Sequence, residues 1–194
     1  MLNKYRLDPA ETMLLVIDVQ TQLTAAMKPE VVAMVEANIN ILVNASKELT
    51  IPILCTEQYR KGIGPTLDSI TKNMGNSFKP VEKLYFSAWG ESAFRDIYGS
   101  INKKYVMISG MESHVCVLQT TLDLLEQGYL VHVISDAVCS RYKNDWENAM
   151  NFLREAGAVI STTEIAVFQL LKKAGTPTFR TISPMFKNKK DYRF

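Results

Sequence analysis

Compact apolar runs alternate with longer amphipathic segments along most of the chain. The first run, residues 13–19, is apolar at every position except 18 and shows no alternation of apolar and polar residues, which is typical of a strand buried on both faces of a sheet. The next segment carries apolar residues at helical spacing from residue 29 to about 47, and Pro29 suits the first turn of a helix. Continued along the chain, this alternation predicts strands at 13–19, 51–57, 79–87, 103–110, 129–137 and 158–162, and helices at 29–47, 92–100, 113–128, 144–155 and 164–173.

The regular alternation of strands and helices favours a mostly parallel sheet with helices on both faces. We therefore predict an α/β protein, a three-layer αβα sandwich with a six-stranded sheet. Ser113, at the start of one predicted helix, and Thr163, just before another, are expected to cap them. No linker or repeat interrupts the pattern, so residues 1–194 are predicted to form a single domain large enough to bury a core.

Composition and charge narrow the choice of partners and compartment. The chain is 47% hydrophobic and 22% charged, as ordinary globular proteins are, and its net charge of +2 gives no reason to invoke nucleic acid. The longest apolar runs are far too short to span a membrane, and residues 1–11 lack the apolar stretch of a signal peptide. Three irregularly spaced cysteines make no disulfide framework. These features predict a cytoplasmic protein with reduced thiols.

Three residues of different chemistry stand at the ends of predicted strands: Asp18, Lys83 and Cys116. Because the ends of parallel strands gather at one edge of a sheet, the three side chains could meet there. Cys116 would be a nucleophile whose pKa is lowered by the helix start, Asp18 its base, and Lys83 its electrostatic support. Each residue alone has a structural explanation, as a packed cysteine, a turn-capping acid or an outward-pointing lysine. Together they predict a cysteine hydrolase.

The stretches that carry these residues resemble the isochorismatase-like cysteine hydrolases, a family that includes nicotinamidases and N-carbamoylsarcosine amidases. The resemblance runs over residues 13–182 and rests on VIDVQ, EKLYFS and GMESHVCVLQTTLDLLEQG. The segment TEQYRKGIGPT is most similar to the isochorismatase-domain-containing proteins. The resemblance implies a triad of Asp18, Lys83 and Cys116 that cleaves a small amide through a cysteine thioester. It also implies a homo-oligomer.

The family's nucleophile turn implies further features of the site. A cis peptide bond is expected between Met111 and Glu112, and the backbone N–H groups of Glu112 and Cys116 are expected to form the oxyanion hole. The chain departs from the nicotinamidases because it lacks their Asp-x-His motif and has only His114 and His132. We therefore expect no metal and no cofactor, and nicotinamide becomes a poorer candidate substrate. A cysteine at the nucleophile position argues against isochorismate itself.

Six further residues flank the expected site and could contact a small-molecule substrate, although each could also belong to the core or to a solvated loop. They are Gln20, Leu23, Glu57, Tyr59, Phe86 and Trp89. Two other functions stay open at this point. The first is a non-catalytic binding or scaffold protein that retains the hydrolase fold. The second is a thiol redox enzyme, for which the chain lacks a CxxC motif.

Overall fold

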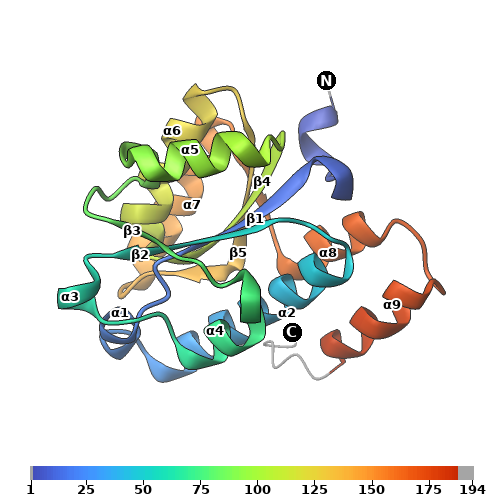
Figure 1. Ribbon diagram of the computed structural model, residues 1–194, viewed down its shortest axis with the longest axis horizontal. Helices are drawn as coiled ribbons and strands as arrows, with labels where there is room; N and C mark the ends of the chain where they lie inside the picture. The colour runs from blue at the N-terminus through green and yellow to red at the C-terminus, as the bar shows by residue number, and fades with distance from the viewer. Residues whose placement is uncertain (1, 188–194) are drawn as a thin grey trace.

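A sheet of six parallel strands forms the centre of the protein (Figure 1), in a computed structural model that describes residues 2–187. The strand order is β3-β2-β1-β4-β5-β6, and every neighbouring pair is parallel. This confirms the predicted fold class. The strands are β1 (Thr12–Ile17), β2 (Ile53–Gln58), β3 (Val81–Lys83), β4 (Tyr105–Met111), β5 (Leu130–Cys139) and β6 (Val159–Ser161).

Helices cover both faces of the sheet. One face packs against α2 and α8, and the opposite face packs against α5, α6 and α7 (Figure 1). The bounds of the helices are α1 (Thr21–Ala25), α2 (Pro29–Glu48), α3 (Arg60–Ile63), α4 (Asp68–Met74), α5 (Ser92–Ile101), α6 (Leu118–Glu126), α7 (Lys143–Ala156), α8 (Thr163–Leu171) and α9 (Pro177–Ile182). None of those within residues 2–187 is long and apolar enough to cross a bilayer.

The unbroken apolar run of β1 follows from its central place between the two helical layers. Leu14 and Val16 contribute to the core under α2, whereas Leu15 and Ile17 contribute to the core under α5, α6 and α7. All four side chains are fully buried, and burying an aliphatic side chain of this size stabilises a fold by about 1.5–3 kcal/mol. Strong burial on both faces therefore fixes the strand from which Asp18 emerges.

Two predicted helix starts are wrong in detail. Ser113 does not cap a helix: it begins a π-helical turn, Ser113–Val117, and its buried hydroxyl has no hydrogen-bond partner among residues 2–187. Thr162, and not Thr163, caps α8 by accepting a hydrogen bond from Ile165 N–H at 3.3 Å. Thr163 is occupied elsewhere, because its N–H and its hydroxyl both donate to Asp136 Oδ1, at 2.7 and 2.8 Å.

The third strand is much shorter than predicted. It ends at Lys83, and the chain bends through Leu84–Ser87 instead of continuing the strand. The bend has a visible cause, since the carbonyl groups of Tyr85 and Phe86 accept hydrogen bonds from the ammonium of Lys83. The loop therefore folds back around the side chain that ends the strand.

Candidate active site

The direction of strand addition reverses between β1 and β4, and in open α/β sheets ligands bind in the crevice at such a point. Asp18 directly follows β1, and Cys116 lies in the π-helical turn Ser113–Val117 that follows β4. Lys83 is the last residue of β3, two strands away from β1. All three predicted residues thus lie at or just beyond the carboxyl edge of one sheet, and π-helical turns are frequent at functional sites.

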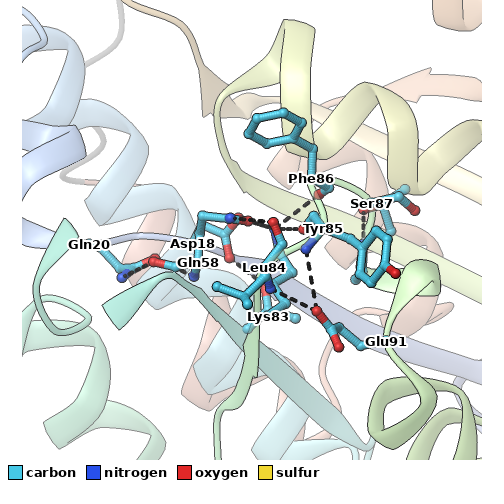
Figure 2. A network of polar contacts seen from close by, with 12 residues as sticks. Asp18, Gln20, Gln58, Lys83, Leu84, Tyr85, Phe86, Ser87 and Glu91 are labelled. Atoms are coloured by element: carbon cyan, nitrogen blue, oxygen red, sulfur yellow. Dashed lines mark hydrogen bonds and ion pairs between the residues drawn. The ribbon is translucent and has the colours of Figure 1, made fainter. Parts of the chain in front are cut away.

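A buried ion pair forms the centre of the site (Figure 2). Lys83 Nζ lies 2.7 Å from Asp18 Oδ2, and both side chains are inaccessible to solvent. The ammonium also donates to Gln58 Oε1 at 2.6 Å, to Phe86 O at 2.9 Å and to Tyr85 O at 3.2 Å. Such additional acceptors are what a charge needs when it is removed from water. The side chain of Lys83 therefore does not point outward into solvent, which was the alternative to a role in the site.

The carboxylate of Asp18 is held unequally at its two oxygens. Oδ1 accepts a hydrogen bond from the Thr56 hydroxyl at 2.7 Å. Oδ2 faces Lys83 but accepts no aligned hydrogen bond from the part of the chain that the structure describes. The backbone of Asp18 is left-handed, with φ +50°, and is held by bonds from its N–H to Thr56 O and from Gln20 N–H to its carbonyl. One oxygen of this buried acid is therefore available to a further proton donor.

Cys116 is buried beside this pair, and only 6% of its surface is exposed. The charges of Asp18 and Lys83 both act on its thiol. Burial and the negative charge of Asp18 raise the pKa of the thiol to about 12, and the positive charge of Lys83 offsets only part of this. The predicted lowering of the thiol pKa is therefore wrong, because loss of hydration outweighs the favourable helix start. At neutral pH, Cys116 is a thiol that needs a base.

The turn between β4 and Cys116 is fixed from several sides. The Met111–Glu112 peptide bond is cis, and the carboxylate of Glu112 accepts hydrogen bonds from Arg141 N–H at 3.0 Å and from Arg141 Nε at 3.1 Å. Gly110 has φ +117°, and a Cβ atom there would lie 1.9 Å from Ile17 O. Only glycine allows β4 to approach the end of β1 this closely, so Gly110 brings the Cys116 turn next to Asp18.

Two of the six predicted substrate contacts have their polar groups occupied within the protein. The Gln20 amide accepts from Gln58 N–H at 2.7 Å and donates to Gln58 O at 3.0 Å and Gly64 O at 2.6 Å (Figure 2). Glu57 is not a solvated loop acid, because it lies within β2 and is fully buried. Its Oε1 accepts from Thr66 N–H and Oγ1, both at 2.8 Å, and its Oε2 pairs with Arg60. Both residues fasten the loop after β2.

The four apolar and aromatic candidates divide into two groups. Leu23 and Trp89 pack against the cores, and Trp89 makes edge-to-face contacts with Phe94, Tyr98 and Tyr129. Tyr59 and Phe86 remain 54% and 55% exposed, close in sequence to Gln58 and Lys83 respectively. Only these two therefore keep an exposed side chain with which a ligand could make contact.

Sequence reasoning missed Thr56 and Gln58, which contact the two charged groups directly. The sequence feature that could have indicated them is their spacing, because two polar residues two positions apart at the end of a buried strand point to the same side of the sheet. Within residues 2–187, no three histidine, cysteine or acidic side chains gather in a way that could hold a metal. His114 Nδ1 lies 2.9 Å from Ser140 Oγ, and His132 Nε2 lies 2.8 Å from Lys4 O, so each histidine has a local partner.

Comparison with known proteins shows the family of this chain. The isochorismatase domain model matches residues 12–165, so the chain belongs to the isochorismatase family. Its homologues in this family indicate that the protein is a hydrolase. Isochorismatase family protein 1A of Dictyostelium discoideum is 40% identical over 78% of this chain and 75% of its own length.

Two solved structures show the same fold. The MAR1 ribonuclease of Caenorhabditis elegans is 32% identical, with a TM-score of 0.87, and the match covers 96% of this chain and 94% of that one. YcaC of Escherichia coli, described as an octameric hydrolase of unknown specificity, is 20% identical with a TM-score of 0.81; the match covers 94% and 96% of the two chains.

The raised thiol pKa has a measurable consequence for alkylation. We expect labelling of Cys116 by iodoacetamide to be nearly constant between about pH 6 and 8, where Asp18 accepts the proton, and to rise above about pH 10 as the thiol itself ionises. In Asp18→Asn the neutral-pH reaction is lost. The alkaline rise then moves to lower pH, because a charge that raises the thiol pKa has been removed. Peptide mapping after timed quenching separates Cys116 from Cys55 and Cys139. A labelling plateau reached below about pH 8 in the Asp18→Asn variant would contradict this account.

Proposed function

We propose that the protein is a cysteine hydrolase that cleaves a small amide through a thioester on Cys116. The observation that carries the proposal is a buried thiol, Cys116, on which the charges of a buried ion pair, Asp18 and Lys83, both act. A thiol whose pKa is raised to about 12 cannot attack efficiently unless a base removes its proton as the new bond forms. In this proposal, Asp18 is that base.

In the first half of the reaction, Cys116 Sγ attacks the amide carbonyl carbon and its proton passes to Asp18 Oδ2. The electron pair of the C=O bond moves to oxygen, and the backbone N–H groups of Glu112 and Cys116 receive this oxyanion. The tetrahedral intermediate then collapses, the C–N bond breaks, and Asp18 returns the proton to the departing amine. An acyl group remains on sulfur.

In the second half, water attacks the thioester carbonyl and gives a proton to Asp18. Collapse of the second intermediate breaks the C–S bond, the sulfur regains the proton, and the carboxylic acid leaves. Lys83 stabilises the negative charge that moves between Asp18 and Cys116, and its bonds to Gln58 and to the carbonyl groups of Tyr85 and Phe86 keep it in place. We propose no metal and no cofactor for either half.

The experiment that tests the proposal is a panel of small primary amides, such as acetamide and propionamide, assayed for ammonia release. Hydroxylamine added to the reaction should divert the acyl group from sulfur and give the hydroxamate. An acylated Cys116 peptide should appear after acid quenching. Ammonia release without acylation of Cys116 would mean direct attack by water, and no turnover of any amide would favour a non-catalytic binding protein.

The proposed substrate is a small molecule, because a thiol that is only 6% exposed suits a small acyl group better than a polymer. Cleavage of single-stranded RNA that is lost in Cys116→Ser would contradict this choice. Nucleic acid and membrane partners are not proposed, and the proposed location is the cytoplasm.

We also propose that the protein is a homo-oligomer. Ile165 and Phe168 of α8 are exposed apolar residues, and YcaC is described as octameric. A monomeric mass in light scattering at micromolar concentration would rule this out.

A further inference from the structure

We infer that Thr56 is a positioning residue for Asp18: its hydroxyl fixes the carboxylate so that Oδ2 alone is left to exchange a proton with Cys116. This inference rests on the proposed function, because it assigns the orientation of the proposed base. Thr56 does not touch the reacting atoms in this account. It acts through the carboxylate that does.

The topology of the sheet explains why a residue of β2 contacts the carboxylate of Asp18. Asp18 follows β1 and Lys83 ends β3, and β2 lies between those two strands. Ile17 pairs with Thr56, and Lys83 pairs with Gln58. Alternate residues of a strand point to the same side of the sheet. The ion pair therefore spans β2, and the side chains of Thr56 and Gln58 reach its acidic and basic ends respectively.

Thr56 holds Asp18 by two separable hydrogen bonds. Thr56 O accepts from Asp18 N–H at 3.2 Å, and Thr56 Oγ1 donates to Asp18 Oδ1 at 2.7 Å. The first bond belongs to the main chain and survives any substitution at position 56. The second depends only on the hydroxyl, whose single hydrogen it uses. Since Thr56 is fully buried, water cannot replace that donor.

The difference between the two carboxylate oxygens gives the hydroxyl its chemical importance. With Oδ1 bound to Thr56, Oδ2 is the oxygen that lies 2.7 Å from Lys83 Nζ and accepts no aligned hydrogen bond from residues 2–187. A proton that leaves Cys116 therefore goes to Oδ2, beside the ammonium that balances the charge. Without the hydroxyl, Oδ1 is a buried acceptor with no donor, and the carboxylate can rotate or take up a proton itself.

The test compares Thr56→Val, which keeps the shape but removes the hydroxyl, with Thr56→Ser, which keeps the hydroxyl. The probe is acrylamide at pH 7, because its addition needs the same proton transfer and no hydrolysis. Cys116 Sγ bonds to the terminal alkene carbon, and the thiol proton passes through Asp18 to the carbon next to the carbonyl. Intact-protein mass spectrometry gives the rate. We expect a roughly tenfold or greater loss in Thr56→Val and less than about a threefold loss in Thr56→Ser.

A double variant distinguishes positioning from a general structural effect. If Thr56 acts through Asp18, then Thr56→Val/Asp18→Asn should react no more slowly than Asp18→Asn alone at about pH 10, where the thiol ionises without Asp18 and both rates can be measured. Thermal unfolding of each variant checks folding, and Thr56→Ala removes the same hydroxyl if the valine variant folds poorly.

Three results would overturn the inference. They are equal acrylamide rates in the wild type and Thr56→Val, equal losses in the valine and serine variants, and an undiminished effect of Thr56→Val in the Asp18→Asn background. Wild-type Cys116 that acrylamide does not label would also count against it, because Asp18 then would not act on the thiol. Failure of the proposed amide hydrolysis is a separate outcome, since the acrylamide rates do not depend on it.

Discussion

Replacing Cys116 by serine should lower amide turnover by about 10⁴-fold or more while leaving the fold unchanged. Removing the nucleophile removes the covalent route altogether, and a serine hydroxyl in the same buried place is far harder to deprotonate than a thiol. The substitution changes one buried atom, so its cost in stability should be small. The measurement is ammonia release from an amide that the wild type hydrolyses, together with thermal unfolding of both proteins.

Cys139→Ser and Cys55→Ser are the matched controls for this substitution. All three cysteines are buried and free, so each replacement puts a hydroxyl in place of a buried thiol. Cys139 contacts Met27 Sδ at 3.2 Å, and Cys55, within β2, packs into the core on the opposite face of the sheet from Cys116. We expect both controls to keep turnover within about threefold of the wild type. More than about a tenth of wild-type turnover in Cys116→Ser would refute the nucleophile assignment.

The second large effect concerns stability. Lys83→Met should lower the free energy of unfolding by about 3–5 kcal/mol, because it leaves the carboxylate of Asp18 buried without a counter-charge. It also removes the donor to Gln58 Oε1 and to the carbonyl groups of Tyr85 and Phe86. Denaturant unfolding at pH 7 measures the loss, and amide turnover should disappear as well.

A double variant identifies the cause of this loss. Asp18→Asn/Lys83→Met buries no charge at the pair, so it should be more stable than Lys83→Met alone even though it carries two substitutions. The interaction between the two changes should be about 1–3 kcal/mol. Recovery will be incomplete, because the other acceptors of the ammonium stay without a donor. If the two losses simply add, the charge of Asp18 is not what makes Lys83→Met costly.

Much of the fold could be predicted because local patterns of apolar residues and helix-starting residues determine most of its strands and helices. β1 is apolar at five consecutive positions, Met13 to Ile17, and such a run fits a strand covered on both faces. The start of α2 was visible at Pro29, and its end was placed within a few residues. The starts of α6 and α8 were harder, because Ser113 and Thr163 both look like caps and only tertiary partners decide their roles.

The site was predictable in outline but not in its supporting contacts. Strand ends placed Asp18, Lys83 and Cys116 at one edge, and the structure brings them together there. The roles of Gln20 and Glu57 depend on the loop after β2, whose path the sequence pattern does not define. The pKa of Cys116 depends on how deeply the turn is buried, which a residue pattern cannot give.

The loop from Leu84 to Phe86 joins the charged network through its main chain alone. Its amide groups bond to Glu91 and its carbonyl groups to Lys83 and Gln58 (Figure 2), while its side chains lie largely in solvent. Any residue other than proline supplies the same amide and carbonyl groups. Evolution can therefore exchange the three side chains at the rim without disturbing the residues proposed for the chemistry, and paralogues could diverge in what they accept through this short stretch.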